Sequence, residues 1–136
     1  MPVITPEIQS CVQAAAHRYN LPEKLILAVI KTEGGKNGLV RHNKNGSVDL
    51  GIMQINSIHL STLKKFGIGY NDILFRACTN IEVGTWILRR QFSYIADYRD
   101  SDQWWRAVGN YHSHSPRYNL AYQKKVWLHL SKLQEK

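Results

Sequence analysis

Two carboxylates in contrasting surroundings are the residues of this chain best suited to chemistry. Glu33 ends an apolar segment with helical spacing, and Asp49 follows a turn rich in glycine and asparagine. The compact run GIMQIN, residues 51–56, comes directly afterwards. If the turn folds back, the two acids face each other across a cleft. A pair of carboxyl groups in different environments is the minimum equipment for cleaving a glycosidic bond.

Three features distinguish Glu33 from an ordinary surface acid. It follows an apolar face, it lies near the negative end of a helix dipole, and Gly34 and Gly35 leave space beside it for a ligand. Desolvation and the dipole both raise the pKa of a carboxyl group, as a general acid working near neutral pH requires. We therefore expect Glu33 to donate a proton. Asp49 either stabilises positive charge on a sugar ring or is a turn residue that bonds its own backbone.

Length and charge bound the class of protein. The chain has 136 residues, which fits one domain spanning 1–136, and a formal net charge of +8. A basic surface attracts nucleic acid, anionic lipid head groups and acidic cell-wall polymers. The basic residues are scattered rather than gathered in one stripe, so we do not expect a nucleic-acid partner. No apolar run reaches membrane-spanning length, and the start at Met1-Pro2 has no leader pattern, so we expect no membrane span and no export signal within this sequence.

Capping residues and apolar periodicity predict a mainly helical α+β protein with one small β-ribbon. Asn-Gly pairs within residues 36–50 predict the ribbon. The expected helices begin at these positions, in chain order: Thr5 (to about Tyr19), Pro22 (to Gly34), Ser57 (to about Phe66), Asn71 or Asp72, Asn80, Ser101 and Ser115-Pro116.

The cysteines and histidines have plain interpretations. Cys11 and Cys78 lie far apart with no CxxC spacing, so they are either two buried free thiols or one disulfide. His112 and His114 are spaced like a pair of metal ligands. They lack further acid or cysteine ligands nearby, so we expect no metal.

The aromatic residues divide into two groups. The tryptophans at helical positions are expected in the core: Trp86, Trp104 and Trp127. Trp105 and Tyr111 share one segment, WRAVGNYHS, and are the better candidates for the wall of a cleft.

Several ordered motifs resemble the lysozyme-like superfamily. Glu33 followed by NKNGSVDLGIMQINS resembles its active-site segment, and is most similar to that of the specialised lytic transglycosylases of secretion, conjugation and type IV pilus systems. The WRAVGNYHS segment resembles that family's third motif, in which a tyrosine, here Tyr111, lines the cleft. The sequence departs from the family pattern in having Gly34 in place of a serine, and Asn110-Tyr111-His112 in place of Ala-Tyr-Asn.

The resemblance implies a lysozyme-like fold and an activity. The expected reaction is cleavage of the bond between N-acetylmuramic acid and N-acetylglucosamine in peptidoglycan, giving a 1,6-anhydro end, with Glu33 and Asp49 as catalytic residues. The same resemblance implies substrate contacts, a Cys11–Cys78 disulfide, no cofactor, and a monomer outside the cytoplasm. The implied substrate-binding residues are Met53, Gln54, Asn56, Tyr111 and His112. Met53 and Gln54 can alternatively be packing and ribbon residues.

Two other functions remain open from the sequence. The NGSVD run also resembles animal-type lysozymes, in which an aspartate at the matching position is the second catalytic carboxylate, so a hydrolytic muramidase is the first alternative. A non-catalytic wall-binding adaptor that assembles with a secretion, conjugation or pilus apparatus is the second. The lytic transglycosylase and the hydrolytic muramidase differ in their products, which have anhydro ends in the first case and reducing ends in the second.

Overall fold

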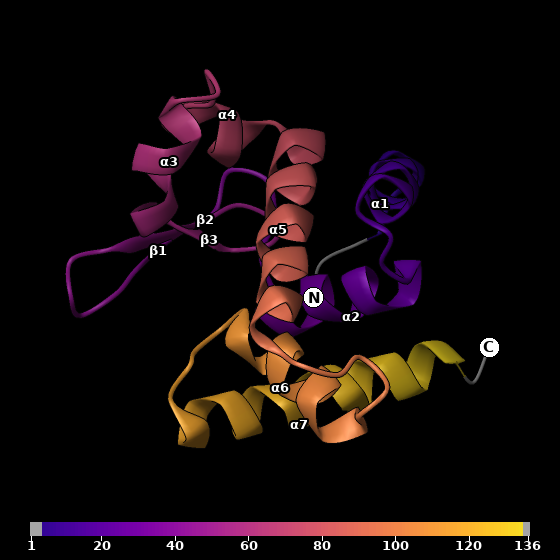
Figure 1. Ribbon diagram of the computed structural model, residues 1–136. Helices are drawn as coiled ribbons and strands as arrows, with labels where there is room; N and C mark the ends of the chain where they lie inside the picture. Colours follow the sequence, from indigo (N-terminus) through magenta and orange to yellow (C-terminus); the bar gives the residue numbers. More distant parts are fainter. Residues whose placement is uncertain (1–3, 135–136) are drawn as a thin grey trace.

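The computed structural model describes residues 4–134. They form an α+β fold that is mainly helical, as the sequence predicted, with one small sheet (Figure 1). The helices are α1 Pro6–Tyr19, α2 Glu23–Glu33, α3 Leu60–Lys64, α4 Tyr70–Phe75, α5 Ala77–Gln91, α6 Ser101–Asn110 and α7 Pro116–Gln134. The strands are β1 Val40–His42, β2 Val48–Leu50 and β3 Ile55–Asn56, and short 3₁₀ turns cover Ser57–His59 and Phe92–Tyr94.

Helix α1 begins where its capping residues predict and is joined covalently to α5. The Thr5 hydroxyl accepts a hydrogen bond from the Ile8 N–H, which satisfies one of the free donors at the helix start. Cys11 and Cys78 form a disulfide, so the disulfide alternative is confirmed. An ion pair of 2.7 Å between the Arg18 Nε and a Glu82 carboxylate oxygen links the same two helices.

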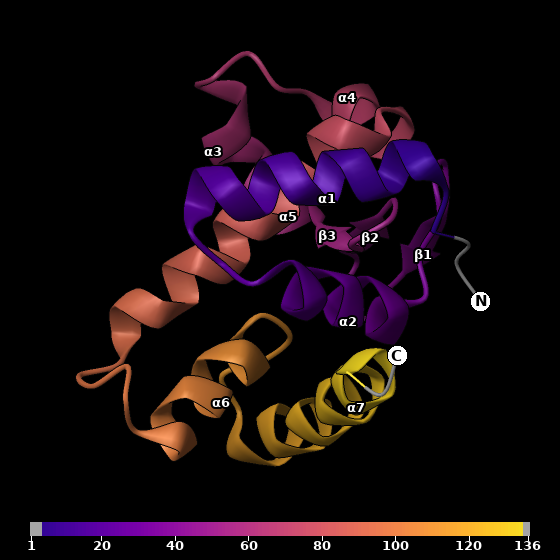
Figure 2. The same cartoon turned by 90° about the vertical axis from the view of Figure 1, so that its right-hand side faces the viewer.

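Helix α5 runs through the middle of the molecule, with the sheet on one side of it and α1 on the other (Figure 1). Helix α2 lies between α1 and α7 and packs against both (Figure 2). Six consecutive α2 residues, from Leu25 to Ile30, are buried. A helix that is buried on nearly all sides in this way is held rigidly by its neighbours. Its last residue, Glu33, is therefore presented from a fixed support.

The predicted β-ribbon is present as a three-stranded antiparallel sheet in the order β1-β2-β3. Asp49 is paired with Arg41 on one side and with Asn56 on the other. The turn between β1 and β2 is closed by side chains, because the Asn45 carboxamide oxygen accepts hydrogen bonds from the N–H and the hydroxyl of Ser47. The sheet is short, and it serves to fix Asp49 and Asn56 side by side.

Three predicted helix starts are wrong in detail. The helix expected from Asn80 begins at Ala77, and Asn80 is buried inside it, where its side chain holds other parts of the backbone. Gly69 rather than Asn71 or Asp72 precedes α4, and Asp72 instead accepts a hydrogen bond from the Gly69 N–H. The segment after Ser57 is capped by Asn56 and starts as a 3₁₀ turn. Asn80 and Ser57 contact other elements, whereas Asp72 caps the start of α4 from its third position.

Two expectations for aromatic residues are also corrected. Trp127, expected in the core, is 54% exposed on the outer face of α7. Trp105, expected at the cleft, lies beside Trp127 in a separate groove. Trp86 and Trp104 pack against the core as expected. Within residues 4–134, none of the helices combines the length and the apolar composition needed to cross a bilayer.

Candidate active site

The end of α2 is closed so that the Glu33 side chain is held at a defined point. Gly34 has φ = 65° and caps the helix in the left-handed conformation, which glycine adopts without steric penalty. The Arg41 guanidinium, from β1, donates hydrogen bonds of 2.7 and 3.0 Å to the carbonyl oxygens of Glu33 and Gly34. A cation on the carbonyls of a helix end is favourable for the helix dipole. The helix end and the sheet are thereby locked together.

The Glu33 carboxyl group has the environment of a general acid. Burial raises its pKa from 4.5 to about 7, and the nearby Asp49 charge raises it too. A hydrogen bond of 2.5 Å donated by the Tyr122 hydroxyl, together with the positive charges of Arg41 and Lys125, opposes the rise. The net pKa near neutrality means that the group exists in both protonation states at physiological pH, so it can donate a proton and take one back.

Tyr122 is a site residue that the sequence analysis missed. It lies on the inner face of α7 with Asn119 and Val126 and is 5% exposed. Burial and the neighbouring Glu33 raise its pKa well above 10, so the hydroxyl stays protonated and acts as a donor. The sequence signal that could have identified Tyr122 is a tyrosine among the apolar positions of a helix, because a buried phenol requires a hydrogen-bond partner. The sequence did not show which group that partner would be.

Tyr111 joins the helical wall of the site to the loop after β2. Its hydroxyl donates a 2.8 Å hydrogen bond to the Met53 carbonyl, and its ring is stacked with that of Tyr122 at a centroid distance of 6.5 Å. Met53 itself is 0% exposed, with its sulfur against the backbone of Gly84. The Met53 side chain therefore has no surface with which to touch a sugar, and its alternative interpretation as a packing residue fits its position.

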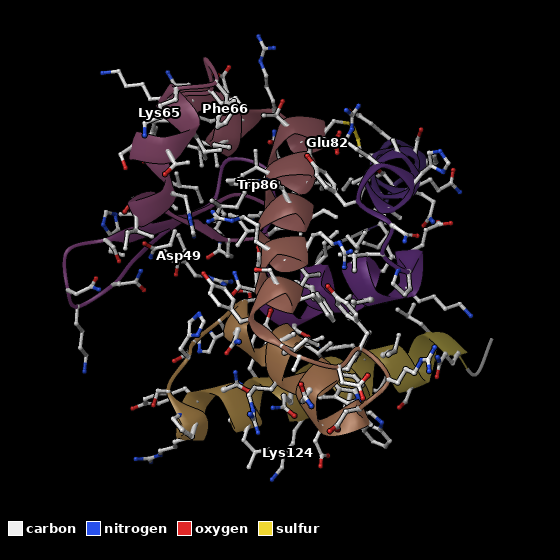
Figure 3. The ribbon with its side chains drawn as sticks, in the orientation of Figure 1. Asp49, Lys65, Phe66, Glu82, Trp86 and Lys124 are labelled. Atoms are coloured by element: carbon white, nitrogen blue, oxygen red, sulfur yellow. A yellow bond between two sulfur atoms is a disulfide. The ribbon has the colours of Figure 1, made fainter. Side chains whose placement is uncertain are left out.

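Asp49 lies within strand β2 and is not a turn residue. Its carboxylate accepts a 2.9 Å hydrogen bond from the Asn56 side-chain amide, which also contacts the Ser47 hydroxyl at 3.1 Å. The alternative in which Asp49 bonds the backbone of its own turn is wrong, because the sheet extends this part of the chain. Figure 3 shows Asp49 on the sheet side of the opening between the sheet and α6–α7.

Gln54 has a strained backbone and an unused hydrogen-bond acceptor. Its φ of 52° lies in the left-handed region, which is unfavourable for a residue with a Cβ atom. The side-chain nitrogen donates to the Gly51 carbonyl at 2.9 Å. The carboxamide oxygen is buried and has no hydrogen-bond partner among the described residues. Gln54 thus combines a left-handed backbone with an unpartnered buried oxygen at the wall of the cleft.

A buried asparagine fixes the loop that carries Gln54. The Asn80 side chain accepts from the Met53 N–H at 2.8 Å and donates to the carbonyls of Leu50 and Ile73, both at 2.9 Å. A Cβ atom on Gly51 would lie 2.3 Å from the Asn80 side-chain nitrogen, so only glycine fits there. Three satisfied hydrogen bonds on one buried amide hold a loop that has little regular structure of its own.

A second buried asparagine holds the turn between α6 and α7. The Asn119 amide donates to the carbonyls of Arg106 and Ser113 and to the Asn110 side chain, at 2.8 to 3.1 Å. A Cβ atom on Gly109 would lie 2.1 Å from the Asn119 oxygen, so the close approach again requires glycine. This turn carries Tyr111 and His112. The His112 ring stacks on the Tyr122 ring at 5.0 Å with an interplanar angle of 10°.

A cleft of about 880 Å³ brings these residues together. Its walls are the sheet and its turn on one side and the α6–α7 turn on the other. Of the seven residues expected to act in catalysis or substrate binding, all except Met53 line this cleft. The six are Glu33, Asp49, Gln54, Asn56, Tyr111 and His112. Among residues 4–134, no three His, Cys, Asp or Glu side chains converge as ligands for a metal ion.

Residues 10–126 match the family model described as "Transglycosylase SLT domain". The chain belongs to this family. The fold is accordingly lysozyme-like, as the sequence motifs implied. The two departures from the family pattern have local structural counterparts. Gly34 adopts a positive φ, which a serine could not adopt without strain, and His112 covers the ring of Tyr122.

Relatives of this transglycosylase-family chain include proteins with names linked to invasion and to peptidoglycan. "Invasion protein IagB" of Salmonella typhi is 37% identical over 130 residues, which cover 92% of this chain and 78% of that protein. "Peptidoglycan-binding-like protein" of Escherichia coli O157:H7 is 32% identical over 141 residues, covering 93% of this chain and 79% of that protein. "Protein IpgF" of Shigella flexneri is 33% identical over 104 residues, covering 76% of this chain and 64% of that protein.

Proposed function

We propose that residues 1–136 form a single lytic transglycosylase domain that cleaves the β-1,4 bond between N-acetylmuramic acid and N-acetylglucosamine in peptidoglycan. The observation that carries the proposal is the placement of Glu33 and Asp49 in one cleft, where burial raises the pKa of Glu33 to about 7. Family membership supports the same reaction class. A carboxyl group that changes protonation state near pH 7 can serve first as acid and then as base within one turnover.

The proposed reaction needs no group outside the protein and the glycan. The Glu33 carboxyl proton passes to the bridging oxygen as the bond from that oxygen to the muramic anomeric carbon breaks. The N-acetylglucosamine side leaves with the proton, and the muramic ring takes on oxocarbenium character. The Glu33 carboxylate then accepts the proton of the muramic C6 hydroxyl, whose oxygen closes onto the anomeric carbon. The product is a 1,6-anhydro end, and Glu33 returns to its starting state.

The remaining cleft residues have proposed supporting roles. Asp49, fixed by Asn56, stabilises the positive charge of the sugar ring or orients the muramic acetamido group. Gln54 lines the cleft and is a proposed substrate contact; its buried carboxamide oxygen would accept a hydrogen bond from an acetamido N–H or a hydroxyl after the side chain turns toward the cleft. Asn56, Tyr111 and His112 contribute polar and aromatic contacts along the cleft walls. Met53 positions Tyr111 through its carbonyl and is not among the proposed sugar contacts.

A hydrolytic muramidase is the second candidate, and one specific observation favours it. Asp49 is held in the cleft with Glu33, as a lysozyme-type mechanism with two carboxylates requires. In that case water, rather than the C6 hydroxyl, attacks the anomeric carbon. A non-catalytic wall-binding adaptor is a third possibility, consistent with the printed name of the Escherichia coli relative. The raised pKa of Glu33 argues against an adaptor, because a cleft that only binds the wall does not need a carboxyl group with a pKa near neutrality.

The proposed place of action is the periplasm or another extracytoplasmic compartment, since the substrate and the disulfide both belong there. From the resemblance of the motifs, we also propose that the wall is opened locally for assembly of a secretion, conjugation or pilus apparatus; a relative in Salmonella typhi is named an invasion protein. The net charge of +8 suits a polymer with acidic peptide stems.

Mass spectrometry of digested peptidoglycan tests the proposal. Purified protein is incubated with intact sacculi, and the released muropeptides are separated and weighed, with Glu33→Gln protein as the control for contaminating activity. We expect 1,6-anhydro muropeptides from the wild type and none from the variant. Reducing-end products would instead identify a hydrolase. The absence of any release by the wild type, together with retained binding to sacculi, would identify an adaptor.

A further inference from the structure

A groove of about 440 Å³ lies on the outer side of α6 and α7, and no residue of it also lines the active-site cleft. Its apolar members are Trp105, Leu120, Trp127 and Leu128. Leu120 is 52% exposed, Leu128 is 53% exposed and Trp127 is 54% exposed. Apolar side chains gathered on one face to this extent are unusual on a protein surface and mark a place of contact.

The charged side chains of α7 all have one sign, although Lys125 lies near Glu33 at the active site and not in the groove. The helix contains four cationic residues, Arg117, Lys124, Lys125 and Lys132, and no aspartate or glutamate between Pro116 and Gln134. Lys124 belongs to the groove itself. Figure 3 shows Lys124 directed away from the rest of the molecule at the α7 side. The outer face of α7 thus combines tryptophan, leucine and lysine.

We propose that this outer α7 face binds the surface of an anionic bilayer, with Trp127 and Leu128 entering the boundary between head groups and acyl chains and Lys124 contacting lipid phosphates. Tryptophan and leucine on one face of a helix with lysine around them is the composition of helices that lie in a membrane interface. Tryptophan in particular favours the head-group level, because its ring is apolar and its N–H is polar.

Charge complementarity favours a lipid surface over a protein partner as the occupant. An anionic bilayer presents a continuous negative charge that attracts every basic residue near it. The groove is lined by four apolar side chains, Gln123 and Lys124, with no acid among them, so an apolar layer beneath an anionic surface complements it. Binding through this face would leave the cleft accessible to glycan strands. The inner face of α7, which holds Tyr122 and Asn119, is buried against the fold and takes no part.

Vesicle binding with matched variants tests this proposal independently of the glycan reaction. The probes are phosphatidylcholine vesicles with and without phosphatidylglycerol, and binding is measured by sedimentation of the full chain. We expect binding only to the anionic vesicles. The variant Trp127→Gln/Leu128→Gln should bind them at least about tenfold more weakly. The control Phe66→Gln/Phe75→Gln removes apolar residues that are 69% and 57% exposed elsewhere on the surface, and it should change binding less than about twofold.

A second pair of variants separates local from overall charge. Lys124→Gln/Lys132→Gln and Lys64→Gln/Lys65→Gln remove the same number of charges, the first pair on α7 and the second at α3. Figure 3 shows Lys65 at the opposite end of the molecule from Lys124. We expect the α7 pair to weaken binding by about tenfold or more and the α3 pair to have a clearly smaller effect.

Insertion itself is read from tryptophan fluorescence with lipids brominated on their acyl chains. We expect quenching in the wild type and a clear reduction of it in Trp127→Phe, in which the partly buried Trp105 of the same groove remains. The proposal is overturned if anionic vesicles are not bound, if phosphatidylcholine alone is bound equally, or if the α7 variants and their controls lose binding equally. The last result would mean that the overall charge of the protein attracts the vesicles without a defined face. Circular dichroism of each variant establishes that it is folded.

Discussion

The two walls of the cleft hold similar acids in dissimilar ways. On the helical wall, the Glu33 side chain is partly buried beside the covered Tyr122, whose phenol donates a hydrogen bond to it. On the sheet wall, Asp49 lies in a strand and is bonded to the amide of Asn56, beside a turn of exposed polar residues. The first acid has a pKa near neutrality because of its burial. The second is partly buried as well, but its neighbours are the amide of Asn56 and the hydroxyl of Ser47.

The contrast shows how one cleft can contain two carboxyl groups with separate tasks. An acid that must release and regain a proton needs a dry site on a rigid support, and α2 supplies this. An acid that offers charge to a developing cation needs amide and hydroxyl neighbours that keep it in place. The predictions below test whether the two walls are as different in effect as they are in structure.

Replacing the acid on the helical wall should have the largest effect. We expect Glu33→Gln to reduce wall cleavage by roughly 10,000-fold, because the amide keeps the shape of the side chain but cannot donate a proton. Release of soluble muropeptides from sacculi measures the rate, and circular dichroism measures the fold. Normal cleavage by the folded variant would mean that another residue is the acid.

The same substitution should stabilise the protein at higher pH. The folded-state pKa of Glu33 is raised, so the folded protein binds more protons than the unfolded chain between pH 4.5 and about 7, and stability falls as pH rises through this window. The Glu33→Gln protein has no carboxyl group at this position, so its stability does not fall in this way. We expect its free energy of unfolding to exceed that of the wild type by up to about 3 kcal/mol above pH 7 and to converge with it near pH 4.

Urea unfolding of both proteins across this pH range measures the difference. A difference that does not change with pH would show that the Glu33 pKa is not raised in the folded state, and the contrast between the two walls would then lose its main support.

Replacing the acid on the sheet wall should have an intermediate effect. We expect Asp49→Asn to slow turnover by about 100-fold, since one well-placed charge in a partly dry cleft contributes a few kcal/mol. The product should remain 1,6-anhydro, because the attacking hydroxyl belongs to the substrate. Asp102→Asn, on the exposed start of α6, serves as the control and should be unaffected.

The outcome for Asp49→Asn also separates the mechanisms. Inactivity equal to that of Glu33→Gln, combined with reducing-end products from the wild type, would make Asp49 a nucleophile. Nearly full activity would mean that its role is only structural.

The smallest effect is expected at the hydrogen bond from Tyr122 to Glu33, the proposed general acid. In Tyr122→Phe the ring and its packing remain, but the donor that lowers the Glu33 pKa is lost, so that pKa should rise further. We expect the pH optimum of cleavage to move to higher pH and the maximal rate to fall by less than about tenfold. Tyr98→Phe, at an exposed tyrosine outside the cleft, should leave the profile unchanged. An unmoved optimum in Tyr122→Phe would contradict the proposed coupling.

Local signals in the sequence were reliable where neighbouring residues decide the structure. The Thr5 cap, the glycine that ends α2 and the asparagine-rich turn of the ribbon were all predicted because each depends on contacts within a few residues. Asn80 shows where such signals fail. Its residue type suits a helix cap, yet its three partners lie in other elements and come near only after folding.

The aromatic residues show the same limit. Helical periodicity indicated that Trp127 and Tyr122 belong to one helix, but it did not show which face of that helix would be covered. Packing of α7 against α2 and α6 covers Tyr122 and leaves Trp127 exposed. Tyr111 was found at the sequence level only through its motif. Its contact with the Met53 carbonyl, far away in sequence, could not be inferred from spacing.

The sequence by itself determined the helices, the ribbon, the family and the identity of Glu33 as the candidate acid, because these depend on short-range patterns and on a motif with a fixed order of residues. Only the tertiary structure decided how that acid behaves. Its pKa depends on the burial supplied by distant elements and on the hydroxyl of Tyr122, 89 residues further along the chain. Desolvation and hydrogen bonding act through space, so their effect on a side chain exists only when the distant parts of the chain have come together.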